Sequence, residues 1–243
     1  MADAPLARHP PAAGSDPADA LRRAAARRAV DWVRDGMVLG LGTGRTVGHA
    51  IEFLAVRARE GLRITGVPSS RATEAKATAL GLALVTLEQC PELDLTIDGA
   101  DEVDPRLRLL KGGGGALLRE KVLAAASRQL LIAVDESKLV PRLGATRGVP
   151  LEVLPFAYVP CARQLERLGG TPQLRRGPGG EPAVTDNGNW LIDCAFPPEQ
   201  MGDPAALDAA LHRIPGLLET GLFWSFRPIV VVADAAGVHV LGT

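Results

Sequence analysis

The sequence has little cysteine, almost no net charge and no long apolar run. Its 243 residues include 27 Lys plus Arg and 28 Asp plus Glu, so no overall positive field is present to hold nucleic acid nonspecifically. No apolar run approaches the roughly 20 residues that span a bilayer, and the N-terminus lacks the layout of a secretory signal. The composition therefore predicts a cytoplasmic protein with no nucleic-acid partner and no membrane partner.

The three cysteines, Cys90, Cys161 and Cys194, are widely spaced and form no C-x-x-C pair. An odd count without such a pair indicates neither a disulfide framework nor a zinc site. Reduced, partly buried thiols are the simpler interpretation. Hydrophobic residues make up 47% of the chain, which is enough to form the core of one large domain or of two modest ones.

The first 16 residues mix proline, alanine and glycine without any period. Such a segment buries too little surface to offset the entropy lost when it is ordered, so residues 1–16 are predicted to be a disordered leader. Asp16 and Pro17 then supply a helix N-cap and a first-turn proline, and apolar residues recur at helical spacing until Gly36. The arginines of this helix, Arg22 among them, are expected to face water.

Apolar strand patterns and amphipathic helix patterns then alternate as far as about residue 147. Strands that are joined by helices pair in parallel. This part of the chain is therefore predicted to be an α/β fold with a Rossmann-like, doubly wound sheet. The predicted strands cover residues 37–41, 62–67, 82–87, 93–98 and 129–134, and the predicted helices cover 46–58, 71–81 and 116–127.

From about residue 149 the order changes to strand, helix, strand, strand, helix and strand, the last strand being expected over 216–223. This order is the signature of a ferredoxin-like βαββαβ unit. The final stretch, 228–242, contains two β-rich runs around an Asp-Ala-Ala-Gly turn, which predicts a hairpin that rejoins the first sheet. The predicted domains are a Rossmann-like catalytic domain over 17–147 and 223–243, and an inserted ferredoxin-like domain over 148–222.

A glycine-rich turn, Gly40-Leu41-Gly42-Thr43-Gly44-Arg45-Thr46, lies between a predicted strand and a predicted helix. Backbone N–H groups and the helix dipole hold a phosphate at such a position. The spacing is not that of a dinucleotide fingerprint, and no Lys-Ser or Lys-Thr pair follows as in a triphosphate P-loop. The turn therefore indicates a monophosphate, with a simple tight turn as the alternative.

Four carboxylates fall within the seven residues Asp98-Gly99-Ala100-Asp101-Glu102-Val103-Asp104, just after an apolar strand. Open α/β sheets bind ligands at this edge. The carboxylates suit a divalent-metal site, a site that grips sugar hydroxyls, or a solvated acidic turn. The residues alone leave these three interpretations open.

Lys111 opens a run of four glycines that leads directly into a helix. Glycines let the backbone approach a ligand closely, and lysine presents a compact positive charge, so a second anion-facing loop is predicted. In the helix that follows, Arg119, Glu120 and Lys121 are the only charged residues. Apolar neighbours would raise the pKa of Glu120 toward that of a useful base. The same neighbours surround Lys121, so spacing does not choose between the two.

Five ordered motifs, G-L-G-T-G-R-T, D-G-A-D-E-V-D, K-G-G-G-G-A-L-L-R-E-K, V-D-E-S-K and V-T-D-N-G-N, together resemble those of ribose-5-phosphate isomerase of the A type. The resemblance runs from about residue 18 to the end. It implies interconversion of D-ribose 5-phosphate and D-ribulose 5-phosphate in the pentose phosphate pathway, with no metal and no nucleotide cofactor. It also implies a CoA-transferase-like sheet and a homodimer or homotetramer whose subunit contacts come from the inserted domain.

The resemblance also assigns residues to the site. Glu120 matches the catalytic base, which takes a proton from C2 and returns one to C1 of a cis-enediolate. Lys111 suits the charge that builds on the carbonyl oxygen, and Asp98 and Asp101 are expected to assist ring opening and proton transfer between oxygens. The substrate-binding positions are Thr43, Gly44, Arg45, Thr46, Asp98, Gly99, Ala100, Asp101, Lys111, Gly112, Gly113, Gly114 and Lys138.

Arg45 departs from the family pattern, which usually has serine at this position. Its guanidinium either binds the phosphate or turns outward. Two rival functions fit a similar fold. One is acyl transfer with a glutamate nucleophile, as in CoA-transferases; the other is a non-catalytic sugar-phosphate sensor, for which no DNA-binding module is apparent.

Overall fold

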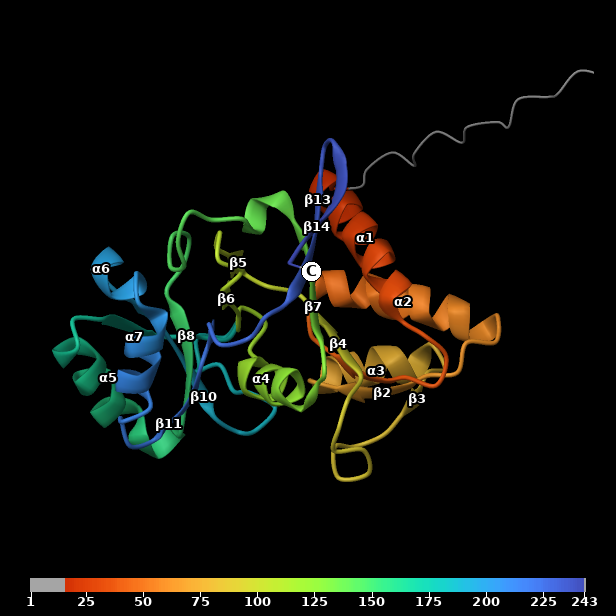
Figure 1. The fold of residues 1–243 in the computed structure, drawn as a ribbon. Coiled ribbons are helices and arrows are strands. Elements are labelled where there is room, and N and C mark those ends of the chain that lie inside the picture. The colour runs from red at the N-terminus through yellow and green to blue at the C-terminus, as the bar shows by residue number, and fades with distance from the viewer. Residues whose placement is uncertain (1–15, 243) are drawn as a thin grey trace, which may run out of the picture.

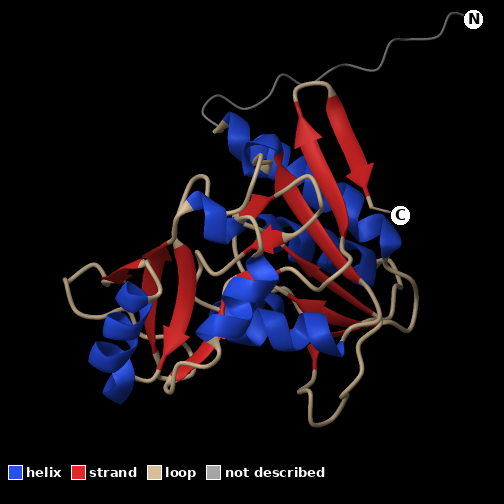
Figure 2. Ribbon diagram, turned by 60° about the vertical axis from the view of Figure 1, so that its left-hand side comes forward, coloured by secondary structure: helices blue, strands red, loops and turns tan. Residues whose placement is uncertain are grey.

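The computed structural model describes residues 16–242, which form three β-sheets with helices packed around them (Figure 1; Figure 2). The largest sheet has seven strands in the order β14-β13-β7-β4-β1-β2-β3. All of them pair in parallel except β14, which forms a hairpin with β13. The predicted doubly wound sheet is therefore confirmed. Its strands are β1 (Val38–Leu41), β2 (Thr65–Pro68), β3 (Ala83–Leu84), β4 (Leu95–Asp98), β7 (Leu130–Asp135), β13 (Ile229–Asp234) and β14 (Gly237–Leu241).

Helices cover both faces of this sheet, and the alternating residues of β7 show why. Leu131 and Ala133 lie in the core formed with α1 and α2, whereas Ile132 and Val134 lie in the core on the opposite face, with Ala124 of α4. A strand that is buried on both faces is apolar throughout. The helices of this part are α1 (Pro17–Ala29), its 3-10 continuation η1 (Val30–Trp32), α2 (Arg45–Arg59), α3 (Arg71–Ala79) and α4 (Leu117–Ala126).

Helix α1 begins where the sequence predicts. The Asp16 carboxylate accepts a hydrogen bond from the N–H of Ala18 at 3.1 Å, and Pro17 is the first helical residue. The rest of the predicted leader, residues 1–15, lies outside the described residues. The expectation that the arginines of α1 face water is wrong for Arg22, whose side chain is only 12% exposed. No helix between residues 16 and 242 is both long and apolar enough to span a membrane.

The inserted segment forms a second, antiparallel sheet of four strands in the order β11-β8-β10-β9. Together with two main helices this is the predicted ferredoxin-like βαββαβ arrangement. Figure 1 has this sheet on the left, with α4 between it and the parallel sheet. The elements are β8 (Val149–Val153), η3 (Pro155–Ala157), α5 (Tyr158–Arg167), β9 (Thr171–Leu174), β10 (Trp190–Ala195), the short α6 (Pro198–Met201), α7 (Pro204–Leu211) and β11 (Leu217–Thr220).

A third sheet of three very short strands was not predicted. It contains β5 (Glu102–Val103), β6 (Leu109–Leu110) and β12 (Leu222–Phe223), in the order β12-β6-β5. The prediction of a single strand over 216–223 is therefore wrong. The strand is interrupted at Gly221, and the two residues that follow, Leu222 and Phe223, pair with β6 instead. The N–H of Gly221 donates to the carbonyl of Pro150, and its own carbonyl accepts from the N–H of Lys111. A Cβ at position 221 would overlap the Lys111 carbonyl, so only glycine fits this crossing.

Candidate active site

A cavity of about 170 Å³ opens at the carboxyl ends of β1, β4 and β7, the edge where doubly wound sheets bind ligands. It is smaller than the roughly 300–1,000 Å³ of sites for drug-sized ligands, so it suits a small metabolite. Every predicted site residue except Asp98 lines it, and one residue not predicted, Arg22, joins them. The lining residues are Arg22, Thr43, Gly44, Arg45, Thr46, Gly99, Ala100, Asp101, Lys111, Gly112, Gly113, Gly114, Glu120 and Lys138.

The ammonium of Lys111 occupies the centre of the charged groups. Its Nζ lies 3.0 Å from Oδ2 of Asp98 and 3.1 Å from Oε2 of Glu120, and it donates to the carbonyl of Gly99 at 2.6 Å. The three side chains are at most 5% exposed. Oδ2 of Asp98 and Oε2 of Glu120 have no hydrogen-bond partner apart from this ion pairing. One cation thus balances two carboxylates in a nearly dry site.

This arrangement changes the ionisation of both Glu120 and Lys111. Burial, and then the negative charge of Asp98, raise the pKa of Glu120 from the ordinary 4.5 to about 8, although the charge of Lys111 acts in the opposite direction. For Lys111, burial favours the neutral amine, but the charges of Asp98 and Glu120 outweigh it and raise the pKa above the usual value. At neutral pH the ammonium of Lys111 is therefore charged, and the Glu120 carboxyl loses its proton as the pH approaches about 8.

The three consecutive charged residues of α4 point in three directions, which resolves the choice that spacing left open. Glu120 enters the cavity. Lys121 turns toward the inserted domain and donates to Oε1 of Glu219 at 2.7 Å. Arg119 donates to Oδ1 of Asn187 at 2.7 Å, within the V-T-D-N-G-N motif. The predicted base is therefore the one of the three that reaches the cavity.

The glycine turn before α2 leaves backbone donors free at the start of the helix. Gly44 is the N-cap, with φ of 112°, and the helix has no side-chain cap, so its first N–H groups remain available to an anion. Gly42 is required for close packing, because a Cβ there would overlap the Asp98 carboxylate. Arg45 lines the cavity, but its side chain is 70% exposed.

Arg22 is the cavity residue that sequence reasoning missed. Its Nε donates to Oδ2 of Asp135 at 3.2 Å, at the end of β7. Its Nη1 lies 3.6 Å from Oδ2 of Asp16 and is buried without a hydrogen-bond partner. In the sequence, Arg22 is one of several arginines on α1, and nothing distinguishes it as a cavity residue. Its partner Asp135 belongs to the V-D-E-S-K motif, which also carries Lys138. A guanidinium with an unused donor therefore faces the same cavity as the Lys138 ammonium.

The four carboxylates of the acidic segment separate instead of converging. Asp98 lies behind Lys111, with 1% exposure, and accepts from the N–H of Thr43. Asp101 lines the cavity and accepts from the N–H of Gly113 at 2.7 Å. The other two carboxylates stabilise nearby loops: Glu102 accepts from Gly144 and Thr146, and Asp104 pairs with Arg108.

This separation does not support a metal site in the acidic segment. Among residues 16–242 the group whose ligand atoms lie close enough for a metal is Asp208, His212 and Glu219. That group lies in the inserted domain and is absent from the cavity wall. Glu219 is already paired with Lys121, and Asp208 accepts from Nε1 of Trp224. The group of possible metal ligands among the described residues and the cavity are therefore separate features of the molecule.

Several known proteins with similar sequences share one name. The sequence model of Ribose 5-phosphate isomerase A (phosphoriboisomerase A) matches residues 65–237. The ribose-5-phosphate isomerase A of Gloeobacter violaceus is 51% identical over 224 residues, which cover 92% of this chain and 96% of the relative. That of Nitrobacter hamburgensis is 46% identical over 229 residues, with coverage of 92% and 97%.

Solved structures of the same name share the fold. Ribose 5-phosphate isomerase A from Methanocaldococcus jannaschii superposes with a TM-score of 0.88 at 38% identity. A D-ribose-5-phosphate isomerase in complex with phospho-erythronic acid superposes with a TM-score of 0.90 at 36% identity. Each comparison covers 93% of this chain and 99% of the other.

Proposed function

This chain belongs to the ribose 5-phosphate isomerase A family, and from this premise we propose how its cavity interconverts D-ribose 5-phosphate and D-ribulose 5-phosphate. The chain is an aldose-ketose isomerase. Acyl transfer and non-catalytic sensing are not favoured, because relatives between 44% and 51% identical carry the isomerase name. The observation that carries the mechanism is the Lys111 ammonium 3.1 Å from the Glu120 carboxylate inside the cavity.

Glu120 carries the proton between the two carbons. Its carboxylate takes the proton from C2 of the open-chain aldose, the C2–H electron pair forms the C1–C2 double bond, and the carbonyl oxygen on C1 becomes negative. A proton then passes from the C2 oxygen to the C1 oxygen. Glu120 returns its proton to C1, and the C2 carbonyl of the ketose forms. One carboxylate near both carbons can serve both steps, because accepting the proton from C2 leaves it able to donate a proton to C1.

Lys111 stabilises the negative oxygen of the enediolate. A buried ammonium that is already fixed between two carboxylates needs no rearrangement when charge develops, which makes its interaction with the transition state strong. We assign Asp98, which does not line the cavity, to holding this ammonium in place. Asp101 lines the cavity, and its carboxylate is the candidate for proton transfer during ring opening and between the sugar oxygens.

The phosphate is assigned to the start of α2. The uncapped N–H groups after Gly44 supply backbone donors, and Arg22 and Lys138 supply positive charge on the same cavity wall. The glycines after Lys111 bring a second set of backbone groups toward the sugar. A monophosphate with a short hydroxylated chain satisfies both ends of the cavity, and no nucleotide or metal cofactor is required.

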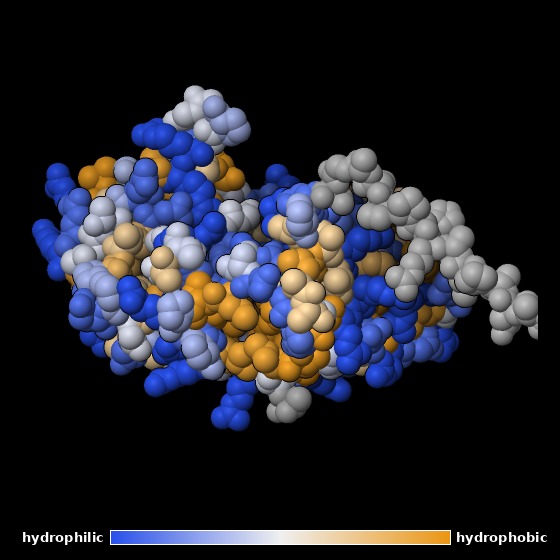
Figure 3. Space-filling model, turned by 90° about the horizontal axis from the view of Figure 1, so that it is seen from above, coloured by the Kyte–Doolittle hydropathy of each residue, from blue (hydrophilic) through white to orange (hydrophobic). Residues whose placement is uncertain are grey.

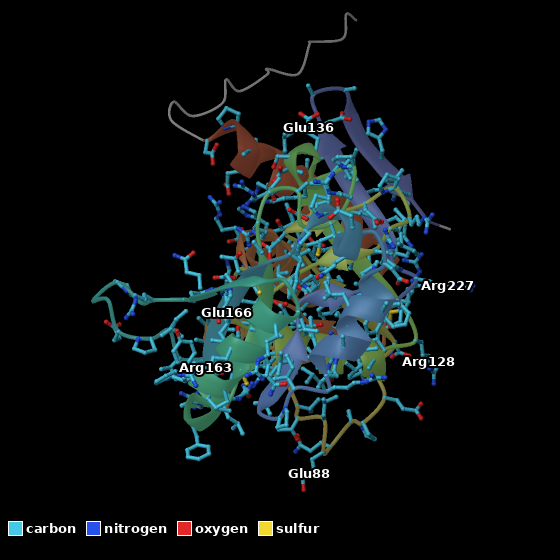
Figure 4. The ribbon with its side chains drawn as sticks, turned by 90° about the vertical axis from the view of Figure 1, so that its left-hand side faces the viewer. Glu88, Arg128, Glu136, Arg163, Glu166 and Arg227 are labelled. Carbon is cyan, nitrogen blue, oxygen red and sulfur yellow. The ribbon has the colours of Figure 1, made fainter. Side chains whose placement is uncertain are left out.

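The decisive experiment measures the formation of ribulose 5-phosphate from ribose 5-phosphate by the unmodified chain and by Glu120→Gln. The variant is expected to fold and to bind the phosphosugar, but to lose turnover by about 10²- to 10⁴-fold, the usual contribution of a general base. Glu88→Gln is the matched control, because Glu88 is exposed on a loop (Figure 4) and does not line the cavity. Retained turnover in Glu120→Gln would remove this residue from the mechanism.

We further propose that the enzyme acts in the cytoplasm as a homodimer or homotetramer, with contacts from the inserted domain. The free state of Cys90, Cys161 and Cys194 suits a reducing compartment.

Exposed apolar side chains on the inserted domain favour subunit contact. Phe156 is 99% exposed and Val159 is 52% exposed. An apolar area also lies between hydrophilic regions on the face in Figure 3. Light scattering on the purified chain and on Phe156→Glu tests the assembly; a monomeric unmodified chain would refute it.

A further inference from the structure

An arginine from the inserted domain holds the glycine loop of the active site. Arg175 follows β9, and its Nη1 donates to the carbonyls of Gly112 at 2.8 Å and Gly113 at 3.3 Å. Arg175 itself is not part of the cavity wall. We propose that Arg175 is a positioning residue for the isomerase reaction, which sets the direction of the backbone groups that the loop after Lys111 presents to the substrate. This inference rests on the proposed function.

The Arg175 guanidinium is itself fixed. Its Nε and Nη2 donate to the two carboxylate oxygens of Asp193 at 2.8 and 2.5 Å. Asp193 lies on β10, directly opposite Gln173 of β9, so sheet pairing sets where its carboxylate stands. The N–H of Arg175 also bonds to the carbonyl of Leu191 at 2.8 Å. Because Nε and Nη2 already bind Asp193, the guanidinium loses little additional freedom when its Nη1 binds the loop.

The direction of the loop peptides matters because a peptide unit has two opposite ends. In a trans peptide the N–H points away from the preceding carbonyl, and no described peptide bond is cis. When Arg175 binds the carbonyl of Gly112, the next N–H, that of Gly113, points the other way and meets Asp101 at 2.7 Å. By the same rule, the carbonyl of Gly113 directs the N–H of Gly114, a cavity residue, away from Arg175.

The loop has one internal backbone bond, from the N–H of Gly115 to the carbonyl of Gly112 at 3.0 Å. It needs further support because glycine does not hold a conformation by itself. Gly112 and Gly115 adopt φ of 109° and 80°, and a bound sugar phosphate would be repelled if the peptides turned their carbonyls toward it. Arg175 binds the carbonyls of Gly112 and Gly113 on the side of the loop that faces away from the cavity. The inserted domain thereby takes part in substrate recognition, beyond any part that it has in subunit contact.

The experiment compares Arg175→Gln with Arg176→Gln as the matched control. Arg176 is the next residue and also an arginine, but it is exposed and bonds only within its own hairpin, to the carbonyl of Gly180. The KM for ribose 5-phosphate is expected to rise about tenfold or more in Arg175→Gln, since misdirected donors bind the substrate poorly. Arg176→Gln should keep the KM of the unmodified enzyme. Asp193→Asn, which keeps Arg175 but loosens its hold, should raise KM in the same direction by less.

A purely structural role would lower the amount of folded enzyme and hence the apparent kcat, but would leave KM unchanged. Equal KM values in Arg175→Gln and Arg176→Gln would therefore overturn the proposal, even if Arg175→Gln were less stable. Hydrogen-deuterium exchange of the peptide that covers residues 110–116 provides a readout independent of turnover. Exchange should be faster in Arg175→Gln than in Arg176→Gln, and equal exchange would overturn the proposal. Absence of isomerase activity in the unmodified chain would instead refute the proposed function, while the exchange comparison would still test the positioning of the loop.

Discussion

Replacing Glu120 by glutamine should change how the stability of the protein depends on pH. A carboxyl whose pKa is higher in the folded chain binds its proton more tightly there than in the unfolded chain. The stability that this proton contributes is complete below about pH 4.5 and is lost as the pH rises toward about 8. Glutamine has no proton to lose. The unmodified enzyme should therefore lose stability relative to Glu120→Gln between pH 5 and pH 8.

The structure sets an upper limit on this effect. Each tenfold change in an ionisation constant is worth about 1.4 kcal/mol, so a rise from 4.5 to about 8 limits the relative change to about 5 kcal/mol. The site is almost completely buried, so screening by solvent reduces this value little, whereas relaxation around the new charge reduces it more. A relative gain of a few kcal/mol by pH 8 is expected for Glu120→Gln.

Urea unfolding at pH 5, 6, 7 and 8 measures the effect, with Glu88→Gln as the control. Glutamine also differs from protonated glutamate in its contacts, which shifts the stability of Glu120→Gln by an amount that does not depend on pH in this range. The informative quantity is therefore the slope of the stability difference against pH. A difference that stays constant from pH 5 to pH 8 would mean that Glu120 is ionised throughout, and would refute the assignment of a raised pKa.

Four further predictions concern activity. The kcat/KM of the unmodified enzyme should rise as the pH approaches about 8, since Glu120 must lose its proton to act as a base; a flat profile from pH 6 upward would contradict this. Arg22→Gln should raise KM about tenfold, the value of a hydrogen bond to a charged group, whereas Arg23→Gln, whose side chain is 53% exposed, should not; equal KM values would exclude Arg22 from phosphate binding. Arg45→Ser should change KM by less than about fivefold, the limit for an exposed ion pair, and a larger rise would indicate direct contact with the phosphate. The rate in EDTA should equal the rate without it, and a loss would restore the metal interpretation of residues 98–104.

The sequence predicted the elements whose patterns repeat over several residues. The apolar run of β7 and the amphipathic pattern of α2 each extend over enough positions to be recognised. The two-residue strands β5, β6 and β12 contain no period at all, and they exist only because distant segments meet. The interruption between β11 and β12 at Gly221 has the same origin, since the Lys111 carbonyl that excludes a side chain there lies far away in the sequence.

The candidate site follows the same division. Glycine-rich turns carry local signals, so the sequence alone placed Gly44 and Lys111 in the candidate site, and both line the cavity. Arg22 and Arg175 carry none, because their roles depend on partners that folding brings together: Asp135 for the first, Gly112 and Gly113 for the second. Spacing also failed to separate Glu120 from Lys121, because adjacent helix positions share neighbours in sequence but differ in the direction of their side chains.

The backbone bonds at Gly221 bear on how the enzyme is made by the ribosome. Lys111 and Pro150 are synthesised before Gly221, and their backbone hydrogen bonds to it can form only once Gly221 has been added. In the same way, β7 can pair with β13 only after β13 has been synthesised. Contacts so distant along the chain form late. A nascent chain that has not yet reached residue 221 has Lys111 in a loop without this backbone bond, so the cavity is complete only after that residue has been added.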